Sequence, residues 1–299
     1  MFVFHHITRT GGVTFKTILG RNFGPQYLKI QKDVFDIILG YNRNHPTGGP
    51  DKLQKILSDD ELKQILDQYK DIHCISSHAF PFPNRFTDFK VMVFLRNPIQ
   101  RVLSAYYYLR DKYVRAGRLP DYANCDFREN IQMFIEYSEH ISDKYEIKNY
   151  CTNFQTHVID NSLDFDAAIS RLRHEFWFVG VTERFDESLV ILRDEFKKIG
   201  YDFNIMYSKK HVHRSKTKKS KISNDFHANE KDIAKLVSMN TMDQKLYEQA
   251  NKLLDKKIIN YEGNFKSDLA MFKRNLLLWK TYQSVVPDGI KKIVNQIRF

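Results

Sequence analysis

Two short segments of this sequence combine residue types that bind anions. Residues 8–14, TRTGGVT, join a cation to two glycines and three hydroxyl groups. Glycines let a backbone turn sharply and approach an oxyanion, a helix start adds a positive dipole end, and Arg9 adds a fixed cation. The segment therefore predicts a phosphate-type loop, with a plain Gly-Gly turn as the alternative. It is not a Walker A loop, because GxxxxGK[ST] does not occur.

The second segment is residues 94–108, FLRNPIQRVLSAYYY. Asn97 can cap a helix and Pro98 suits its first turn, so Arg96 is expected at a strand end and Ser104 about two turns into the helix. Arg can hold a phosphate with two donors, and Ser can add a third. The alternatives are an ion pair at the helix start and a solvent-facing Ser. We expect Arg101 to be either an ion-pair partner or a ligand, and Tyr106–Tyr108 to serve packing.

The segment SSHAF (76–80) supplies a candidate general base, His78. A neutral imidazole near pH 7 can accept a proton from an attacking group, whereas a hydrogen-bonded core or cap histidine is the alternative. The other histidines are weaker candidates: His5 and His6 lie within a predicted strand, His73 alternates away from the expected face of His78, and His211 and His213 lie in a basic loop. Since His, Cys and Asp show no metal-ligand spacing, no metal site is expected.

Short, nearly all-apolar runs must position these groups. Runs at 2–7, 72–77, 90–95 and 176–181 predict strands, and their continuity is typical of a parallel sheet covered on both faces. Helical patterns begin at 14 and occupy 59–69, 97–113, 127–140, 165–174, 185–199 and 242–258, and the tail 268–299 is mostly helical with Pro287 interrupting it. The expected fold is α/β: a three-layer, P-loop-like fold with a central parallel sheet flanked by helices and a helical C-terminal extension. We expect one domain over 1–262, with 263–299 packed on it.

Ligands of open parallel sheets bind beyond the carboxyl ends of the strands. The phosphate-type loop, His78 and the Arg96 segment each follow a predicted strand, and Thr182, Glu183 and Arg184 follow the fourth. All four strand ends are therefore expected to face one crevice, although a simple turn is an alternative for residues 182–184.

Composition limits the partners. The 299 residues carry a net charge of +11, but seven of the positive charges lie between Ser208 and Lys221, which leaves +4 for the remainder. That segment has no aromatic residue, so nucleic-acid binding is not expected. No apolar run reaches the roughly 18 residues of a membrane span. The three cysteines, without a CxxC pair or a secretory leader, favour a cytoplasmic protein without a membrane partner.

Four segments together resemble one family. HITRTGGVTF is similar to the 5′-phosphosulfate loop, and FLRNPIQRVLSAYYY to the 3′-phosphate element, of sulfotransferases that use 3′-phosphoadenosine 5′-phosphosulfate (PAPS). VGVTERFDESLVIL (179–192) and SSHAF also resemble family segments, the latter the one that carries the catalytic histidine. The similarity is greatest to the carbohydrate type related to heparan sulfate 2-O- and 6-O-sulfotransferases. Thr8-Arg9 departs from the Pro-Lys usual there, so a guanidinium stands where that family has an ammonium.

The resemblance implies a metal-independent enzyme that transfers a sulfuryl group from PAPS, in line, to a hydroxyl or amine of a saccharide or small metabolite, leaving PAP. His78 would be the general base and Arg9 would neutralise the leaving group. The implied cofactor-binding residues are Arg9, Thr10, Gly11, Gly12, Val13, Thr14, Arg96, Ser104, Thr182, Arg214, Ser215 and Lys216. The sequence leaves open the acceptor's identity and the oligomeric state. Alternatives from other classes are a kinase-like phosphotransferase and a non-catalytic module that binds a polyanion through the basic loop.

Overall fold

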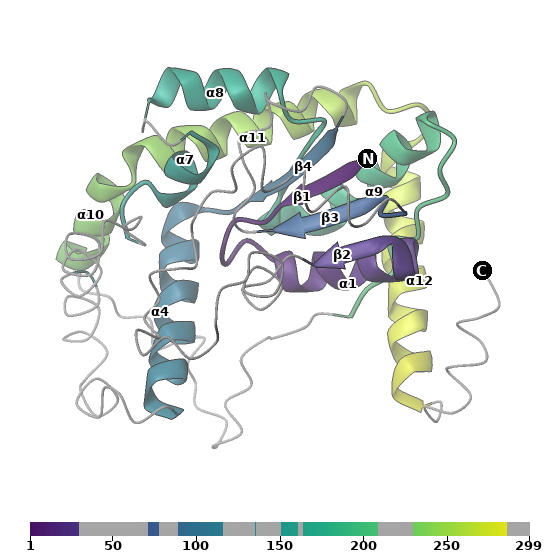
Figure 1. Cartoon of the computed structure of the whole chain (residues 1–299), viewed down its shortest axis with the longest axis horizontal. Coiled ribbons are helices and arrows are strands. Elements are labelled where there is room, and N and C mark those ends of the chain that lie inside the picture. Colours follow the sequence, from purple (N-terminus) through teal and green to yellow (C-terminus); the bar gives the residue numbers. More distant parts are fainter. Residues whose placement is uncertain are drawn as a thin grey trace.

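Five parallel strands of the described residues form the centre of the molecule. The computed structural model describes residues 1–29, 71–77, 89–115, 135, 151–160, 164–208 and 230–285. The strands are β1 (Phe2–His5), β2 (Tyr27–Lys29), β3 (Cys74–Ser77), β4 (Lys90–Leu95) and β5 (Phe178–Val181). Their order is β2-β3-β1-β4-β5, and every neighbouring pair is parallel (Figure 1). The predicted α/β fold with a parallel sheet is thus confirmed.

The register brings the functional loops to one edge of the sheet. His5 pairs with Ser77 of β3 and with Val93 of β4, and Leu95 pairs with Val181 of β5. Four strands therefore end close together. The loop after β1, the turn after β4 and the turn after β5 leave the sheet at this edge, as ligand sites of open parallel sheets require.

Helices flank the sheet and complete three layers. They are α1 (Gly12–Phe23), α4 (Pro98–Arg115), α7 (Phe154–Ile159), α8 (Phe165–His174), α9 (Phe185–Lys198), α10 (Glu230–Met239), α11 (Thr241–Ile259) and α12 (Phe265–Val285), with 3-10 turns η1 (Gly24–Gln26) and η4 (Thr182–Arg184). In Figure 1, α7, α8 and α11 lie together beyond one side of the sheet and α1 lies on the other.

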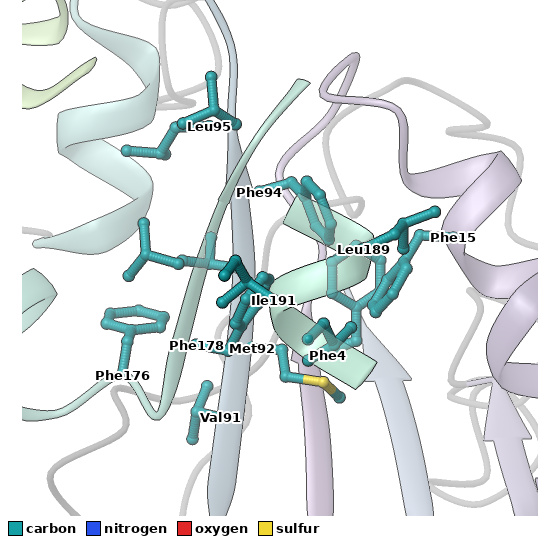
Figure 2. Packing of buried hydrophobic residues seen from close by; sticks show 14 of the residues in the cluster. Phe4, Phe15, Val91, Met92, Phe94, Leu95, Phe176, Phe178, Leu189 and Ile191 are labelled. Carbon is teal, nitrogen blue, oxygen red and sulfur yellow. The ribbon is translucent and has the colours of Figure 1, made fainter. Parts of the chain in front are cut away.

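Side chains alternate between the two faces of the sheet, and both faces are buried. Figure 2 shows Phe4 and Phe94 beside Phe15 of α1 and Leu189 of α9, while Leu95 lies on the opposite side. The ring centroids of Phe4 and Phe15 are 4.7 Å apart, and those of Phe15 and Phe94 are 4.9 Å apart. These aromatic contacts fix α1 against β1 and β4, so the start of α1 is held rigidly above the strand ends.

Helix α12 adds to the same core. Its Phe272 and Leu276 are buried in the hydrophobic cluster that includes the strands, and the Arg21 guanidinium of α1 lies 5.2 Å from the centroid of the Trp279 ring. Among the helices in the described ranges, none combines the length and the apolar character that crossing a bilayer takes. That residues 263–299 form an extension of a domain at 1–262 stays a prediction.

Several expected boundaries differ from the structure. The expected strands at 2–7, 72–77 and 176–181 are shorter in the structure, and His6 lies just past β1 rather than within it. The pattern missed β2, α7 and α10, because three or six residues carry too little periodicity to be recognised and α10 is only ten residues long. The expected helix at 59–69, most of that at 127–140 and all of the basic segment after Ser208 lie outside the described residues.

Candidate functional site

The loop between β1 and α1 has a backbone shape that exposes the start of the helix. Arg9 has a φ of 71° and Gly11 a φ of 84°, so two residues of the loop adopt the left-handed region. Helix α1 begins without a side-chain cap and without an acidic residue in its first turn. An uncapped helix start presents free N–H groups and a positive dipole end, which favours an anion there.

Gly12 is required by the neighbouring imidazole. A Cβ atom built on Gly12 would lie 1.9 Å from Nε2 of His6, far inside van der Waals contact. His6 itself is buried and stacks on the Phe4 ring, with centroids 5.2 Å apart. The first residue of α1 therefore packs directly on a fixed ring, which holds the loop close to the sheet.

Arg9 connects the loop to helix α4. Its Nε and Nη2 donate hydrogen bonds to the Ser104 hydroxyl, at 3.0 and 2.9 Å, and its guanidinium carbon lies 4.8 Å from the centroid of the Tyr108 ring. Burial lowers the pKa of Arg9, and the nearby charge of Arg96 lowers it further. Arg9 stays charged, and its charge is little screened by water.

Arg96 stands beside Arg9 at the end of β4. Its Nη1 donates to the carbonyl of Arg9 at 3.1 Å, and its Nε lies 3.7 Å from Oε1 of Glu183. Burial lowers the pKa of Arg96, while the Glu183 charge partly opposes that effect. The Arg96 Nε–H group is buried and has no hydrogen-bond acceptor among the described residues, so it can donate to a bound ligand.

The turn after β5 holds both loops in place. The Thr182 hydroxyl lies 2.9 Å from the Thr10 carbonyl and 3.0 Å from the Leu95 carbonyl, so it bridges the ends of β1 and β4. The Glu183 carboxylate accepts the Asn97 backbone N–H at 3.2 Å and so caps the start of α4. Residues 182 and 183 thus orient the site, a role that their position in the sequence alone did not suggest.

A second layer of hydrogen bonds fixes the backbone of Arg96. Gln155 of α7 accepts from the Arg96 N–H at 2.9 Å and donates to its carbonyl at 2.8 Å. The Gln155 N–H in turn donates to buried Asp243 of α11 at 3.0 Å. Sequence reasoning missed Gln155 and Asp243. Tyr108 was expected only to pack, but its spacing of four residues from Ser104 places both on one face of α4 and could have indicated its contact with Arg9.

The structure brings most of the predicted residues together. Arg9, Thr10, Gly11, Gly12, Thr14, Arg96, Ser104 and Thr182 gather at the ends of β1, β4 and β5, with Val13 exposed at the start of α1. The Thr10 hydroxyl is buried and donates to the Ile7 carbonyl at 2.9 Å, which stabilises the loop. Arg101 is buried, with its guanidinium 4.6 Å from the Phe154 ring centroid.

His78, Arg214, Ser215 and Lys216 lie outside the described residues. Ser77, the residue before His78, is described: it is buried, and its carbonyl accepts the His6 N–H at 2.9 Å. The chain therefore leaves β3 directly beside the phosphate-type loop. Within the described ranges, no group of three His, Cys, Asp or Glu side chains is placed to hold a metal ion.

Comparison with known proteins gives the class to which this fold and site belong. A family model described as the sulfotransferase family matches residues 1–249, and the chain belongs to that family. A solved structure, that of a sulfotransferase from Alicyclobacillus acidocaldarius, is 17% identical with a TM-score of 0.46, and the match covers 82% of this chain and 93% of that one. No curated protein matches the chain. The chain is thus a sulfotransferase, not the kinase-like or non-catalytic alternative.

Proposed function

We propose that this sulfotransferase takes its sulfuryl group from PAPS and transfers it to a hydroxyl or amine of a saccharide or small-molecule acceptor. One observation carries the proposal: the Arg9 guanidinium donates to the Ser104 hydroxyl while the Arg96 guanidinium donates to the Arg9 carbonyl, so two cations and one hydroxyl gather at the carboxyl ends of β1 and β4. A donor with phosphate groups at both ends of its ribose needs two anion-binding elements held at a fixed separation. Members of this family generally use PAPS.

The side chains fit the 3′-phosphate of such a nucleotide. The Ser104 oxygen accepts two N–H groups from Arg9, which leaves its own hydrogen to donate, and a phosphate oxygen is a pure acceptor. The buried Nε of Arg96 lacks an acceptor among the described residues. We assign Arg96 and Ser104 to the 3′-phosphate, because a guanidinium and a hydroxyl can together hold such a group.

The loop before α1 would hold the 5′-phosphosulfate. Gly11, Gly12 and Val13 provide backbone N–H groups at an uncapped helix start, and Thr14 adds its hydroxyl, since its N–H donates to the Gly11 carbonyl at 3.1 Å. The Thr10 hydroxyl donates to the Ile7 carbonyl, so Thr10 shapes the loop. Arg9 stands beside them with a half-buried charge. Thr182 orients this loop through the Thr10 carbonyl, and Arg214, Ser215 and Lys216 are proposed to close over the nucleotide.

PAPS, when bound, supplies an activated sulfuryl group and a phosphate leaving group. Arg9 stabilises the negative charge that develops on the leaving oxygen, because its cation is half-buried, held by Ser104 and needs no rearrangement. His78 accepts the proton of the attacking hydroxyl or amine. Both groups follow strands that end at one edge of the sheet, which supports their acting on the same bound donor.

A thermal-shift comparison tests the donor assignment. We expect PAP to raise the melting temperature more than equal concentrations of 5′-AMP, ADP or ATP with Mg²⁺, at two salt concentrations. A ligand at about 100 times its dissociation constant adds roughly 2.7 kcal/mol to the free energy of unfolding, which is readily seen. Stabilisation by ATP with Mg²⁺ alone, or by no nucleotide, would contradict the proposal.

Cytoplasmic location, absence of a metal requirement, and the saccharide or metabolite acceptor remain parts of the proposal that rest on the sequence. A polyanion-binding role of the basic segment has no described residue to support it beyond Ser208. The two salt concentrations of the thermal-shift experiment distinguish nucleotide binding in a pocket from polyanion binding by the basic segment. Polyanion binding weakens steeply with salt, whereas nucleotide binding in a pocket weakens much less.

A further inference from the structure

A pair of lysines lies on the other side of the phosphate-type loop from Arg96. Lys29 ends β2, the edge strand of the sheet, and Lys16 lies in the second turn of α1. Within the described residues neither lysine has a carboxylate within ion-pair distance. The two positive charges are therefore not compensated by the part of the chain that the structure describes.

Helix and strand geometry places the two lysines together. Gly20 of α1 faces β2, since a Cβ built on Gly20 would lie 3.3 Å from Cδ1 of Tyr27. Lys16 is one helical turn before Gly20 and so lies on the same face, nearer the carboxyl end of β2. Tyr27 and Lys29 are two residues apart in the strand and share a face of the sheet, and Lys29 Nζ is 5.6 Å from the Tyr27 ring centroid.

The space between α1 and β2, here named the wedge, holds Lys16, Lys29 and two hydroxyl groups. The Tyr27 and Ser76 hydroxyls are 2.7 Å apart, and Ser76 pairs with Lys29 in the sheet register. Lys16 is half-buried, and Lys29 is exposed at the sheet edge. Burial and the charge of Lys29 both lower the pKa of Lys16, which indicates a cation that has lost water without gaining an anionic partner.

The position of this wedge relates it to the acceptor rather than to the nucleotide. Ser76 and Ser77 end β3, and His78 is the next residue along the chain. Arg96 and Ser104 lie beyond β1, on the β4 side. With His78 as the proposed base, the attacking group approaches from the side where β3 ends, and the remainder of the acceptor is then directed toward β2 and its lysines.

We propose that Lys16 and Lys29 form a subsite for an oxyanion of the acceptor, a carboxylate or a sulfate, so that the enzyme selects anionic acceptors over neutral ones. This inference rests on the proposed function, because it takes the β3 side as the acceptor side. An ammonium pair binds either oxyanion as a point charge without demanding planar geometry. The Tyr27 and Ser76 hydroxyls lie beside the pair and can orient the bound group.

The test is a ligand-observed NMR titration of the full chain, saturated with PAP, with glucose, glucuronate and glucose 6-sulfate. We expect at least one of the two anionic sugars to bind about tenfold or more tightly than glucose in the wild type. The double variant Lys16→Gln/Lys29→Gln should lose this preference. The exposed Lys252→Gln on α11 is the matched control and should keep it.

Equal affinity for all three sugars in the wild type, absence of binding included, would overturn the subsite. So would a preference that persists in the double variant or disappears in Lys252→Gln. Comparing glucuronate with glucose 6-sulfate shows which oxyanion is recognised. PAP binding is measured first in every variant, and the titration is repeated without PAP. If the donor assignment is wrong, PAP does not stabilise the wild type. If the subsite is wrong, PAP still binds but sugar binding does not depend on the two lysines.

Discussion

Arg9 and Arg96 are like charges in contact through the Arg9 carbonyl, and such a pair destabilises a protein that has no anion between them. Burial lowers the pKa of each, and in the described ranges only Glu183 forms an ion pair with either guanidinium, while its oxygens also accept the Asn97 N–H. A bound phosphate relieves this repulsion while gaining buried, poorly screened donors. The strain of the free site is thus a source of affinity for a doubly charged ligand.

Replacing Arg96 with alanine should weaken PAP binding selectively. Loss of a charge-assisted contact to the 3′-phosphate is expected to cost about 1.5–3 kcal/mol, or roughly 10- to 150-fold in dissociation constant. Binding of 5′-AMP, which lacks that phosphate, should change little. Calorimetric titration of both nucleotides measures the difference, with the exposed Arg173→Ala as control. Equal losses for PAP and AMP would instead mean that Arg96 supports the fold of the loop.

Replacing His78 with alanine should separate chemistry from donor binding. Without a base to accept the acceptor proton, turnover is expected to fall about 10²- to 10⁴-fold. PAP affinity should stay close to that of the wild type, because the phosphate contacts are made by other residues. Transfer of ³⁵S from labelled PAPS gives turnover, and exposed His174→Ala on α8 is the matched control. Turnover near the wild-type value would remove His78 from this role.

The sequence predicted some residues of the site and missed the contacts of others. Arg9, Arg96 and Ser104 were found because each follows a recognisable strand or helix start, where ligands of parallel sheets bind. Glu183 contacts Asn97 from 86 positions further along the sequence, and that contact depends on the pairing of β4 with β5. Sequence patterns report local periodicity, so they do not reveal such partners.

At the level of elements, two helix starts stabilise each other. Asn153 Oδ1 accepts the N–H groups of Met242 and Asp243 at the start of α11, at 3.0 and 3.2 Å. Asp243 in return accepts the N–H groups of Gln155 and Thr156 at the start of α7, at 3.0 and 2.7 Å. In neither helix does the side chain of the N-cap residue accept a hydrogen bond from the first turn of the same helix. These reciprocal hydrogen bonds explain why α7, only six residues long, is a stable helix. Gln155 of α7 then fixes the backbone of Arg96.

Substitution of Asp243 by alanine should therefore destabilise the protein strongly. It would leave the Gln155 and Thr156 N–H groups and the Thr156 hydroxyl without their acceptor in a buried place, at a cost of about 3 kcal/mol. Asp164→Ala is the matched control: it removes the exposed cap of α8 and should cost about 1 kcal/mol. Denaturant unfolding measures both. Similar losses in the two variants would show that burial of the Asp243 network adds nothing.

Elements were predicted best where their own sequence determines them. The expected strand at 90–95 and the expected helix at 165–174 have the observed bounds, because the strand is a continuous apolar run and the helix has its own Asp164 cap. Strand β2 is three residues long and exists by pairing with β3, and α7 depends on Asp243 from α11. Elements stabilised mainly by distant partners leave no local signal.

At the scale of the whole molecule, α12 follows the residues matched by the family model yet shares their core. Phe272 and Leu276 are buried in the cluster that contains the strands, and each such side chain contributes roughly 1.5–3 kcal/mol by leaving water. Trp279 lies against Arg21 of α1, the helix that begins at the phosphate-type loop. We therefore expect the helix and the sheet to unfold together.

The two tryptophans of the chain allow this to be measured, since Trp279 reports on α12 and Trp177 on the sheet, where it packs on Phe2 and Phe196. In Trp177→Phe, the fluorescence of Trp279 should change at the same urea concentration as the far-ultraviolet circular dichroism. In Trp279→Phe, the fluorescence of Trp177 should do likewise, because coincident probes mark a single cooperative transition. A Trp279 transition at clearly lower urea would mean that 263–299 unfolds as a separate unit. The contact with Arg21 would then not couple α12 to the nucleotide loop.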